Sequence, residues 1–171
     1  YPKIGDYIWV TGNIGESYIG LQIKKKKLSF FNNINNYYID KYLYPKPNLI
    51  GSQIVKYASS CIDISDGLLG DLSKILNAKI GANLNYSLIP FSKKTIKLIS
   101  LNKLNSFSLL NAGDDYELIF TASEKFSNKI YNLANNNNIK ITNIGRIIDK
   151  KGIFINNKKI KDINGSYNYL F

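Results

Sequence analysis

The apolar residues of this chain change their spacing several times along its length, and this pattern constrains the fold more than any other feature. A spacing of two is typical of a strand with one buried face, whereas a spacing of three to four is typical of an amphipathic helix. Both occur in short stretches, without the regular strand–helix–strand rhythm of a parallel sheet. The sequence therefore predicts an α+β fold, with a mixed, largely antiparallel sheet and helices packed on it.

The boundaries of the expected elements follow from these spacings and from the residues that begin and end them. Pro45 and Pro47 end one helical stretch and enforce an extended link. Ser123 and Glu124 suit the first turn of a late helix. We expect strands at 7–10, 61–65, 82–86, 116–121, 140–147 and 153–155, and helices at 16–26, 32–43, 52–58, 67–76, 92–101 and from 123 into the Asn run.

The chain has 171 residues and a 44% hydrophobic content, which is enough material for one buried core. No apolar run approaches the roughly 20 residues of a membrane helix, and the first residues do not form a signal peptide. We therefore expect a cytoplasmic protein without a membrane partner. Because the sequence contains no Met, we expect residues 1–171 to be a single domain from a longer chain.

Histidine is absent, which excludes Ser-His-Asp and Cys-His catalysis by this chain and removes the commonest transition-metal ligand. Cys61 stands alone, so an internal disulfide and a multi-cysteine zinc site are excluded, and we expect it to be a small core residue. Any chemistry must then rest on carboxylates, whose hard oxygens suit magnesium or calcium. Magnesium commonly accompanies phosphate, so phosphoryl transfer is the reaction class that remains.

The net charge of +11 raises the question of nucleic acid binding. Arg146 is the single Arg among 23 basic residues, whereas bidentate recognition of phosphate and guanine favours Arg. We therefore expect no nucleic acid partner. The run Lys24 to Lys27 is either an anion site or, as we favour, a solvated helix end, because cations stabilise helix carboxyl termini.

Asp63, Ser65 and Asp66 lie where a predicted strand passes into a predicted helix. Side chains alternate along a strand, so Ile62 and Ile64 should face the core while Asp63 and Ser65 share the opposite face. Free backbone amides at a helix start attract anions, and a divalent cation on Asp63 and Asp66 could bridge phosphate oxygens there. The simpler alternative is that Ser65 or Asp66 caps the helix beside a surface Asp63.

A second acidic cluster, Asp114, Asp115 and Glu117, precedes and enters another predicted strand. Acids beside buried apolar surface are costly unless a cation or hydrogen-bond donors compensate for them. The alternative is an ordinary turn of Gly and Asp residues. The Gly-rich turn at 12–17 is weaker evidence, since it could approach a ligand or simply connect a strand to a helix.

Together these stretches resemble the thiamine-monophosphate kinase family and, at the level of fold, the wider group of aminoimidazole ribonucleotide synthetase and selenophosphate synthetase. The resemblance covers essentially the whole chain, and its last two blocks are specific to the kinase family. The four blocks are residues 5–12 (GDYIWVTG) with 15–17 and 20–21, residues 44–47 (YPKP), residues 62–68 (IDISDGL) with 71–72, and residues 113–118 (GDDYEL).

The resemblance assigns roles to five residues. It implies that Asp63 and Asp66 bind magnesium and carry catalysis, and that Ser65 contacts ATP. Asp114 stands where the family usually has Glu and contacts the thiamine substrate. Tyr167 stands where the family has a terminal aromatic that packs on the substrate, which suits a cationic thiazolium ring.

The resemblance further implies ATP-dependent phosphorylation of thiamine monophosphate to thiamine diphosphate, with Mg²⁺ and ATP bound. The acceptor is already an ionised phosphate oxygen, so positioning and charge neutralisation can replace a general base, in agreement with the missing His. This chain would be the C-terminal AIR synthetase-like domain. An amino-terminal half would supply further ligands and a homodimer interface, so we expect the isolated fragment to be inactive.

Two alternatives remain open. One is a catalytically decayed domain that still binds a nucleotide or a thiamine phosphate. The other is a different ATP-dependent enzyme of the same fold.

Overall fold

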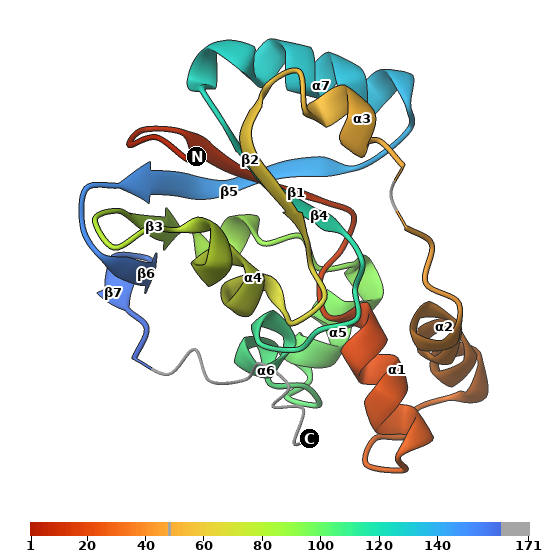
Figure 1. Ribbon diagram of the computed structural model, residues 1–171. Helices are drawn as coiled ribbons and strands as arrows, with labels where there is room; N and C mark the ends of the chain where they lie inside the picture. The colour runs from red at the N-terminus through yellow and green to blue at the C-terminus, as the bar shows by residue number, and fades with distance from the viewer. Residues whose placement is uncertain (48, 162–171) are drawn as a thin grey trace, which may run out of the picture.

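A seven-stranded sheet organises the computed structural model, which describes residues 1–47 and 49–161 (Figure 1). Its strand order is β2-β4-β1-β5-β3-β6-β7, and all neighbouring pairs are antiparallel except the parallel pair β3–β6. The predicted mixed, largely antiparallel sheet is confirmed. The strands are β1 (Tyr7–Thr11), β2 (Ala58–Asp63), β3 (Gly81–Leu84), β4 (Leu118–Ala122), β5 (Ile141–Ile148), β6 (Gly152–Ile155) and β7 (Lys158–Lys159).

Helices lie on both faces of this sheet (Figure 1). One face carries α3 and α7, and the other carries α1, α4, α5 and α6, with α2 packed against α1. None of the described helices combines the length and the apolar surface that a membrane span requires. The bounds are α1 (Glu16–Lys24), α2 (Asn32–Leu43), α3 (Gly51–Ile54), α4 (Leu68–Ile75), α5 (Lys93–Ser100), α6 (Ser106–Leu110) and α7 (Ser127–Asn136), with 3₁₀ turns η1 (Tyr86–Leu88) and η2 (Glu124–Phe126).

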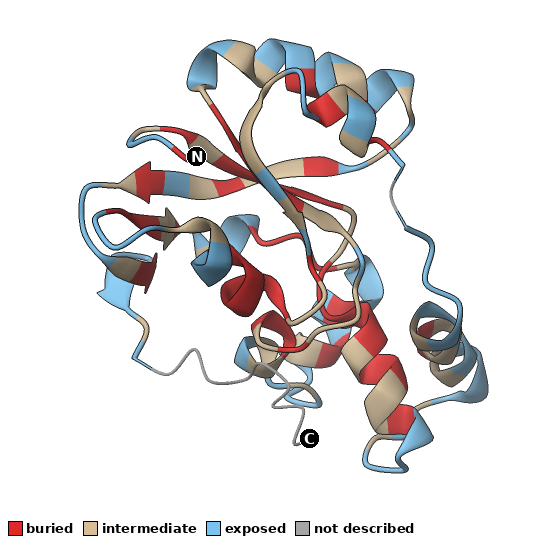
Figure 2. Ribbon diagram, in the orientation of Figure 1, coloured by how far each residue is buried: buried red, intermediate tan, exposed pale blue. Residues whose placement is uncertain are grey.

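The alternation of side chains along β1 divides the core in two. Ile8 and Val10 point into the larger cluster, which includes Leu72 of α4, whereas Trp9 points to the opposite face and packs with Phe120. All five side chains are fully buried. Figure 2 shows the colour of buried residues along the middle strands of the sheet. The central strand is therefore covered on both sides, which explains why its sequence is almost continuously apolar.

Strand β2 is where the sequence interpretation departs most from the structure. It begins at Ala58, three residues before the expected strand, because its backbone pairs with β4 from that point onward. Helix α3 correspondingly ends at Ile54, earlier than the expected helix at 52–58. The expectation that Cys61 is a core residue was wrong, since its side chain is exposed. Alternation places Cys61 on the same face as Asp63, and this edge strand leaves that face open to solvent.

Several short elements had no periodic signal. Helix α6, turn η1 and strand β7 span only two to five residues each, too few to show a repeat. Ser123 makes no side-chain cap, and the chain after it forms η2 before α7 begins. The run from Lys24 to Lys27 is exposed where α1 ends, as expected for a solvated helix end.

Close packing between α1 and α2 generates a prediction about two helical glycines. A Cβ added at Gly20 would lie 2.0 Å from the carbonyl oxygen of Tyr38, whereas a Cβ at Gly70 would meet nothing nearer than Asp66 Cβ at 3.7 Å. Gly20→Ala should therefore destabilise the fold by about 1–3 kcal/mol through overpacking. Gly70→Ala should instead gain up to about 1 kcal/mol of helix propensity.

Urea unfolding midpoints of the two variants measure this difference. Equal effects of both substitutions would show that α1 and α2 do not pack as closely as described.

Candidate functional site

Backbone hydrogen bonds join the two acidic stretches that the sequence singled out. The Asp114 amide donates to the Ser65 carbonyl (3.0 Å), and the Tyr116 amide donates to the Ile64 carbonyl (2.9 Å). The Ile64 amide in turn donates to the Glu117 carbonyl (2.7 Å). These bonds continue the antiparallel pairing of β2 with β4 beyond the ends of both strands. Residues some 50 positions apart in the sequence therefore form one surface.

Two glycines allow these loops to touch. A Cβ at Gly113 would lie 1.9 Å from the Ser65 carbonyl oxygen. Gly67 has a φ of +110°, and a Cβ there would lie 2.7 Å from the carbonyl carbon of Asn111. Both positions exclude a side chain, and the φ of Gly67 is one that other residues rarely adopt. The junction at 65–67 is consequently packed backbone to backbone against residues 111–114.

The buried carboxylate of Asp71 holds the strand-to-helix junction in place. Its Oδ2 accepts the amides of Ser65 (2.9 Å) and Asp66 (2.8 Å), and its side chain is completely buried. Gly67 is the residue that precedes α4, and no side chain caps this helix. The simpler interpretation, in which Ser65 or Asp66 caps the helix, was therefore wrong. An acid in the first turn of α4 reaches back to the loop instead.

Lys74 supplies a positive charge to the same junction. Its Nζ lies 2.5 Å from Asp66 Oδ2 and 2.6 Å from Asp71 Oδ1. These hydrogen bonds, first to Asp66 and then to Asp71, raise the pKa of Lys74 above its ordinary value. The ammonium group shows that a cation is favoured beside Asp66, and carboxylate oxygens are the ligands that Mg²⁺ prefers. The donor set thus fits a hard divalent cation.

The described residues offer only a few protein ligands for such a cation. Within the described ranges, no group of three or more acidic, His or Cys side chains is close enough to hold a metal. Asp63 is exposed at the end of β2, and Asp66 lies in the bend that follows. A cation bound by these two residues would keep part of its coordination for water or phosphate oxygens, as Mg²⁺ usually does.

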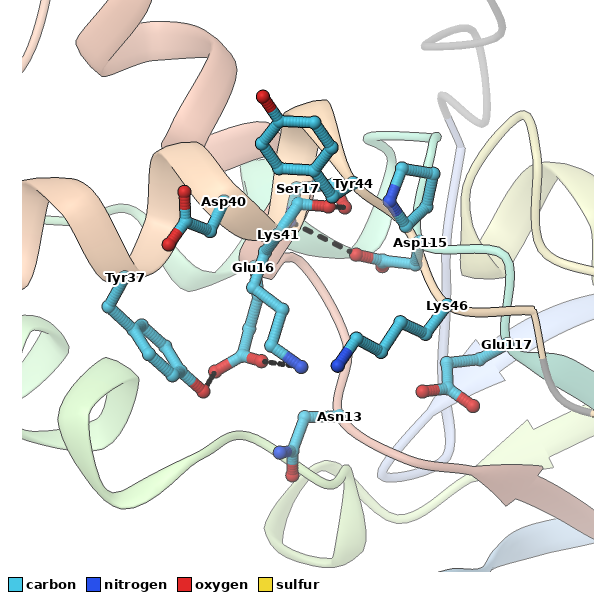
Figure 3. A pocket seen from close by; sticks show the side chains of 11 residues that line it. Asn13, Glu16, Ser17, Tyr37, Asp40, Lys41, Tyr44, Lys46, Asp115 and Glu117 are labelled. Atoms are coloured by element: carbon cyan, nitrogen blue, oxygen red, sulfur yellow. Dashed lines mark hydrogen bonds and ion pairs between the residues drawn. The ribbon is translucent and has the colours of Figure 1, made fainter.

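The first two blocks of the resemblance meet the fourth at a pocket of about 450 Å³ (Figure 3). Asp115 Oδ2 accepts the Gly15 amide (2.7 Å) at the start of α1, and Thr11 Oγ1 donates to Glu117 Oε2 (2.5 Å). These contacts fix the Gly-rich turn against the second acidic cluster. Lys46, from the block at 44–47, also lines the pocket.

The wall formed by α1 and α2 carries its own charge pair. Glu16 is 3% exposed, accepts the Tyr37 hydroxyl (2.8 Å) and pairs with Lys41 (3.6 Å). Figure 3 shows the ammonium groups of Lys41 and Lys46 pointing toward each other between Glu16 and Glu117. The pocket is therefore lined by charges of both signs.

Asp63 and Asp114 differ from these acids. Among the residues that the structure describes, neither side chain makes a hydrogen bond or an ion pair. Asp114 lines a separate pocket of about 310 Å³ together with Tyr18, Phe107 and Lys25. Acids with internal partners stabilise the fold, whereas Asp63 and Asp114 are available to a ligand.

The predicted site residues thus fall into two groups. Asp63, Ser65, Asp66 and Asp114 lie on the surface formed by the paired loops. Tyr167 lies outside the described residues. Sequence reasoning gave no role to Asp71 or Lys74, although both left a signal: Asp71 borders the apolar stripe of α4, and Lys74 follows it by three residues.

The chain is similar to known proteins in sequence and in structure. The family model for "AIR synthase related protein, C-terminal domain" matches residues 3–157. A thiamine-monophosphate kinase of Buchnera aphidicola (subsp. Acyrthosiphon pisum) is 44% identical over 165 residues, which is 92% of this chain and 50% of that protein. The chain spans about half the length of the curated relatives it matches.

Solved structures of thiamine-monophosphate kinases superpose on this chain. Thiamine-monophosphate kinase from Stenotrophomonas maltophilia K279a superposes with a TM-score of 0.77 at 25% identity, covering 93% of this chain and 52% of that one. AaThiL complexed with AMPPCP and TMP superposes with a TM-score of 0.77 at 25% identity, covering 94% and 50%.

The buried carboxyl of Asp115 makes stability depend on pH. The residue keeps some exposed surface at the pocket wall, but protein surrounds its carboxyl, and this desolvation raises its pKa to about 8. The amides of Gly15 and Ser17 oppose the shift, and Glu117 and Glu16 add to it. Because the folded state raises this pKa, it favours the protonated form of Asp115. The contribution of protonated Asp115 to the free energy of unfolding is therefore complete near pH 4 and is lost as pH rises through 8.

We therefore expect the wild-type protein to lose stability between pH 4 and pH 8 relative to Asp115→Asn, by at most about 1.4 kcal/mol per pH unit. The Asn variant keeps an acceptor for the Gly15 amide but cannot ionise. Urea unfolding of both proteins across this range measures the difference. Parallel pH profiles would contradict the shifted pKa.

Proposed function

This chain belongs to the AIR synthase related protein family, whose C-terminal domain it matches, and from that premise we propose that it is the C-terminal part of a thiamine-monophosphate kinase. The proposed reaction transfers the γ-phosphoryl group of ATP to the phosphate of thiamine monophosphate, giving thiamine diphosphate and ADP. Relatives named thiamine-monophosphate kinase, and a related structure that holds AMPPCP and TMP, support this reaction. The observation that carries the proposal is the 3.0 Å bond from the Asp114 amide to the Ser65 carbonyl.

That bond matters because it joins the loop proposed to bind the nucleotide to the loop proposed to bind the thiamine substrate. Asp63, Ser65 and Asp66 are proposed to serve the nucleotide and its metal, and Asp114 to serve the thiamine substrate. Backbone contact between their loops keeps these groups in a fixed relation. Holding donor and acceptor in line is the main contribution a protein makes to phosphoryl transfer.

We propose that Asp63 and Asp66 hold Mg²⁺, which when bound would neutralise charge on the transferring phosphates. Ser65 stands between the two acids, and its hydroxyl makes no hydrogen bond to the residues that the structure describes, so it is free to donate to a phosphate oxygen. Because the acceptor phosphate is already ionised, none of these residues needs to remove a proton. Their role is to position the reacting phosphate groups and to balance the negative charge of those groups.

We place the thiamine moiety beside Asp114. Its pocket, of about 310 Å³, also presents the rings of Tyr18 and Phe107. A carboxylate with aromatic neighbours suits a cationic thiazolium ring through Coulomb and cation–π attraction. Lys25, at the same pocket, is a candidate partner for the substrate phosphate.

The proposal includes a homodimer formed through a second domain, which the resemblance implies. It also includes a cytoplasmic location without nucleic acid or membrane partners, which we expect from the composition of the chain. Sedimentation of the complete protein and its distribution after cell fractionation test them.

Substituting the proposed metal ligands tests the catalytic assignment in the complete protein. Asp63→Asn and Asp66→Asn should each lower turnover by roughly 100-fold or more, because electrostatic stabilisation of the transferring group is lost. ADP release measures the rate, and far-ultraviolet circular dichroism checks that both variants fold. Asp149→Asn, an exposed acid in the turn between β5 and β6, is the matched control and should keep wild-type turnover.

Rates for Asp63→Asn and Asp66→Asn equal to that of the control would refute the metal role. Binding of thiamine monophosphate and MgATP without ADP formation by the wild-type protein would instead identify a catalytically decayed domain.

Substituting Asp114 tests the placement of the substrate. Asp114→Ala should raise the KM for thiamine monophosphate by about 10-fold or more, the cost of one charge-assisted contact, and leave the KM for ATP nearly unchanged. Asp114→Glu retains the acid and should keep most of the affinity. Steady-state kinetics with each substrate varied in turn separates the two constants. A shift confined to the KM for ATP would place Asp114 at the nucleotide instead.

A further inference from the structure

Lys74 occupies a position that a bound cation would favour. Its Nζ lies between two carboxylates, 2.5 Å from Asp66 Oδ2 and 2.6 Å from Asp71 Oδ1. Asp66 is one of the two residues to which the proposed function assigns a metal. The chain therefore carries a positive charge of its own at an oxygen that a divalent ion would use.

We propose that Lys74 is a positioning residue that acts as a tethered cation: it holds Asp66 in place before metal arrives and releases it when a divalent cation binds. This inference rests on the proposed function, because it takes the metal role of Asp66 from there. It adds a competition between Lys74 and the metal that the resemblance does not imply.

The two carboxylates differ in how firmly they hold Lys74. The side chain of Asp71 is completely buried, and its Oδ2 already accepts the amides of Ser65 and Asp66. Removing a cation from a buried carboxylate leaves a costly uncompensated charge. Asp71 should therefore keep Lys74 throughout.

Asp66 can release Lys74 more easily. Its side chain is 31% exposed, and among the described residues Lys74 is its only hydrogen-bond or ion-pair partner. Exposed ion pairs contribute little free energy, because water solvates both partners well. The flexible Lys74 side chain is itself 44% exposed, so its ammonium group can move off Asp66 while remaining near Asp71.

The arrangement has a consequence for metal binding. Asp71 orders the backbone of Ser65 and Asp66, and Lys74 orders the Asp66 carboxylate, so the loop is formed in advance. A divalent ion gains from this order but must break the contact between Lys74 and Asp66. Removing the ammonium should therefore tighten metal binding, whereas a residue that merely stabilised the loop would weaken binding when removed.

Mn²⁺ binding to the complete protein without nucleotide tests the competition, with free Mn²⁺ measured by electron paramagnetic resonance. We expect Lys74→Met to lower the Kd for Mn²⁺ by about 3-fold or more, and Lys74→Arg to keep the wild-type value because it keeps the charge. Lys79→Met removes an exposed charge just beyond α4 and is the matched control for long-range electrostatics. Its Kd should change by less than 2-fold. A Kd for Lys74→Met that is unchanged, raised, or lowered only as much as in Lys79→Met would overturn the proposal.

Thermal unfolding gives a second readout. In EDTA, Lys74→Met should have a lower Tm than the wild type, because Asp71 then lacks its cation. Mn²⁺ should raise its Tm more than it raises that of the wild type. If Lys74→Met does not fold, Lys74→Gln takes its place, since its amide can still donate to Asp71. An equal Mn²⁺ response of variant and wild type also overturns the proposal.

The double variant Asp66→Asn with Lys74→Met identifies the ligand involved. The gain in Mn²⁺ affinity should disappear, and its persistence would show that Asp66 is not the residue for which Lys74 competes. These outcomes are independent of turnover. Absence of kinase activity with the competition intact would defeat the proposed function alone, and normal kinase activity without the competition would defeat this inference alone.

Discussion

The arrangement of the site depends on the antiparallel pairing between β2 and β4 and on its continuation into the loops at 64–66 and 114–117. A strand pair normally ends where its hydrogen bonds end, and the side chains beyond it then point in independent directions. Here three more backbone hydrogen bonds continue the pairing, so two acidic loops become one surface. Backbone contact at Gly113 and Gly67 fixes their separation, because neither position has room for a side chain. Residues assigned to nucleotide and to substrate thus share one rigid support.

The face on which these acids lie could be predicted from the sequence, because it depends on the alternation of neighbouring side chains along a strand. The alternation of Ile62, Asp63 and Ile64 placed the acid opposite the core, and the structure confirms it. What local rules could not provide were partners from distant segments. Asp115 meets the start of α1 about 100 residues away, and β2 becomes an edge strand only through the sheet order, which is why Cys61 is exposed.

The acids of the site divide by whether the fold already satisfies them. Glu16, Asp71 and Asp115 accept hydrogen bonds from a tyrosine hydroxyl or from backbone amides, and the packing of α1, α2 and α4 depends on these contacts. Asp63 and Asp114 make no such contact within the described part of the chain. The spacing of acids in the sequence does not distinguish these two classes. Burial and hydrogen bonding do, and they separate acids that the fold already satisfies from acids that remain without a partner in the described part of the chain.

The charge of the whole chain makes this concentration of acids unusual. The protein has 23 basic and 12 acidic residues, yet the surface formed by the two loops and the adjoining pocket gathers Asp and Glu side chains from four separate segments, near residues 16, 40, 63–66 and 114–117. Phosphate oxygens approaching such a surface alone would be repelled. Lys41 and Lys74 offset part of that charge from within the chain. In the proposed function, the remaining positive charge would come from the metal ion that accompanies the nucleotide.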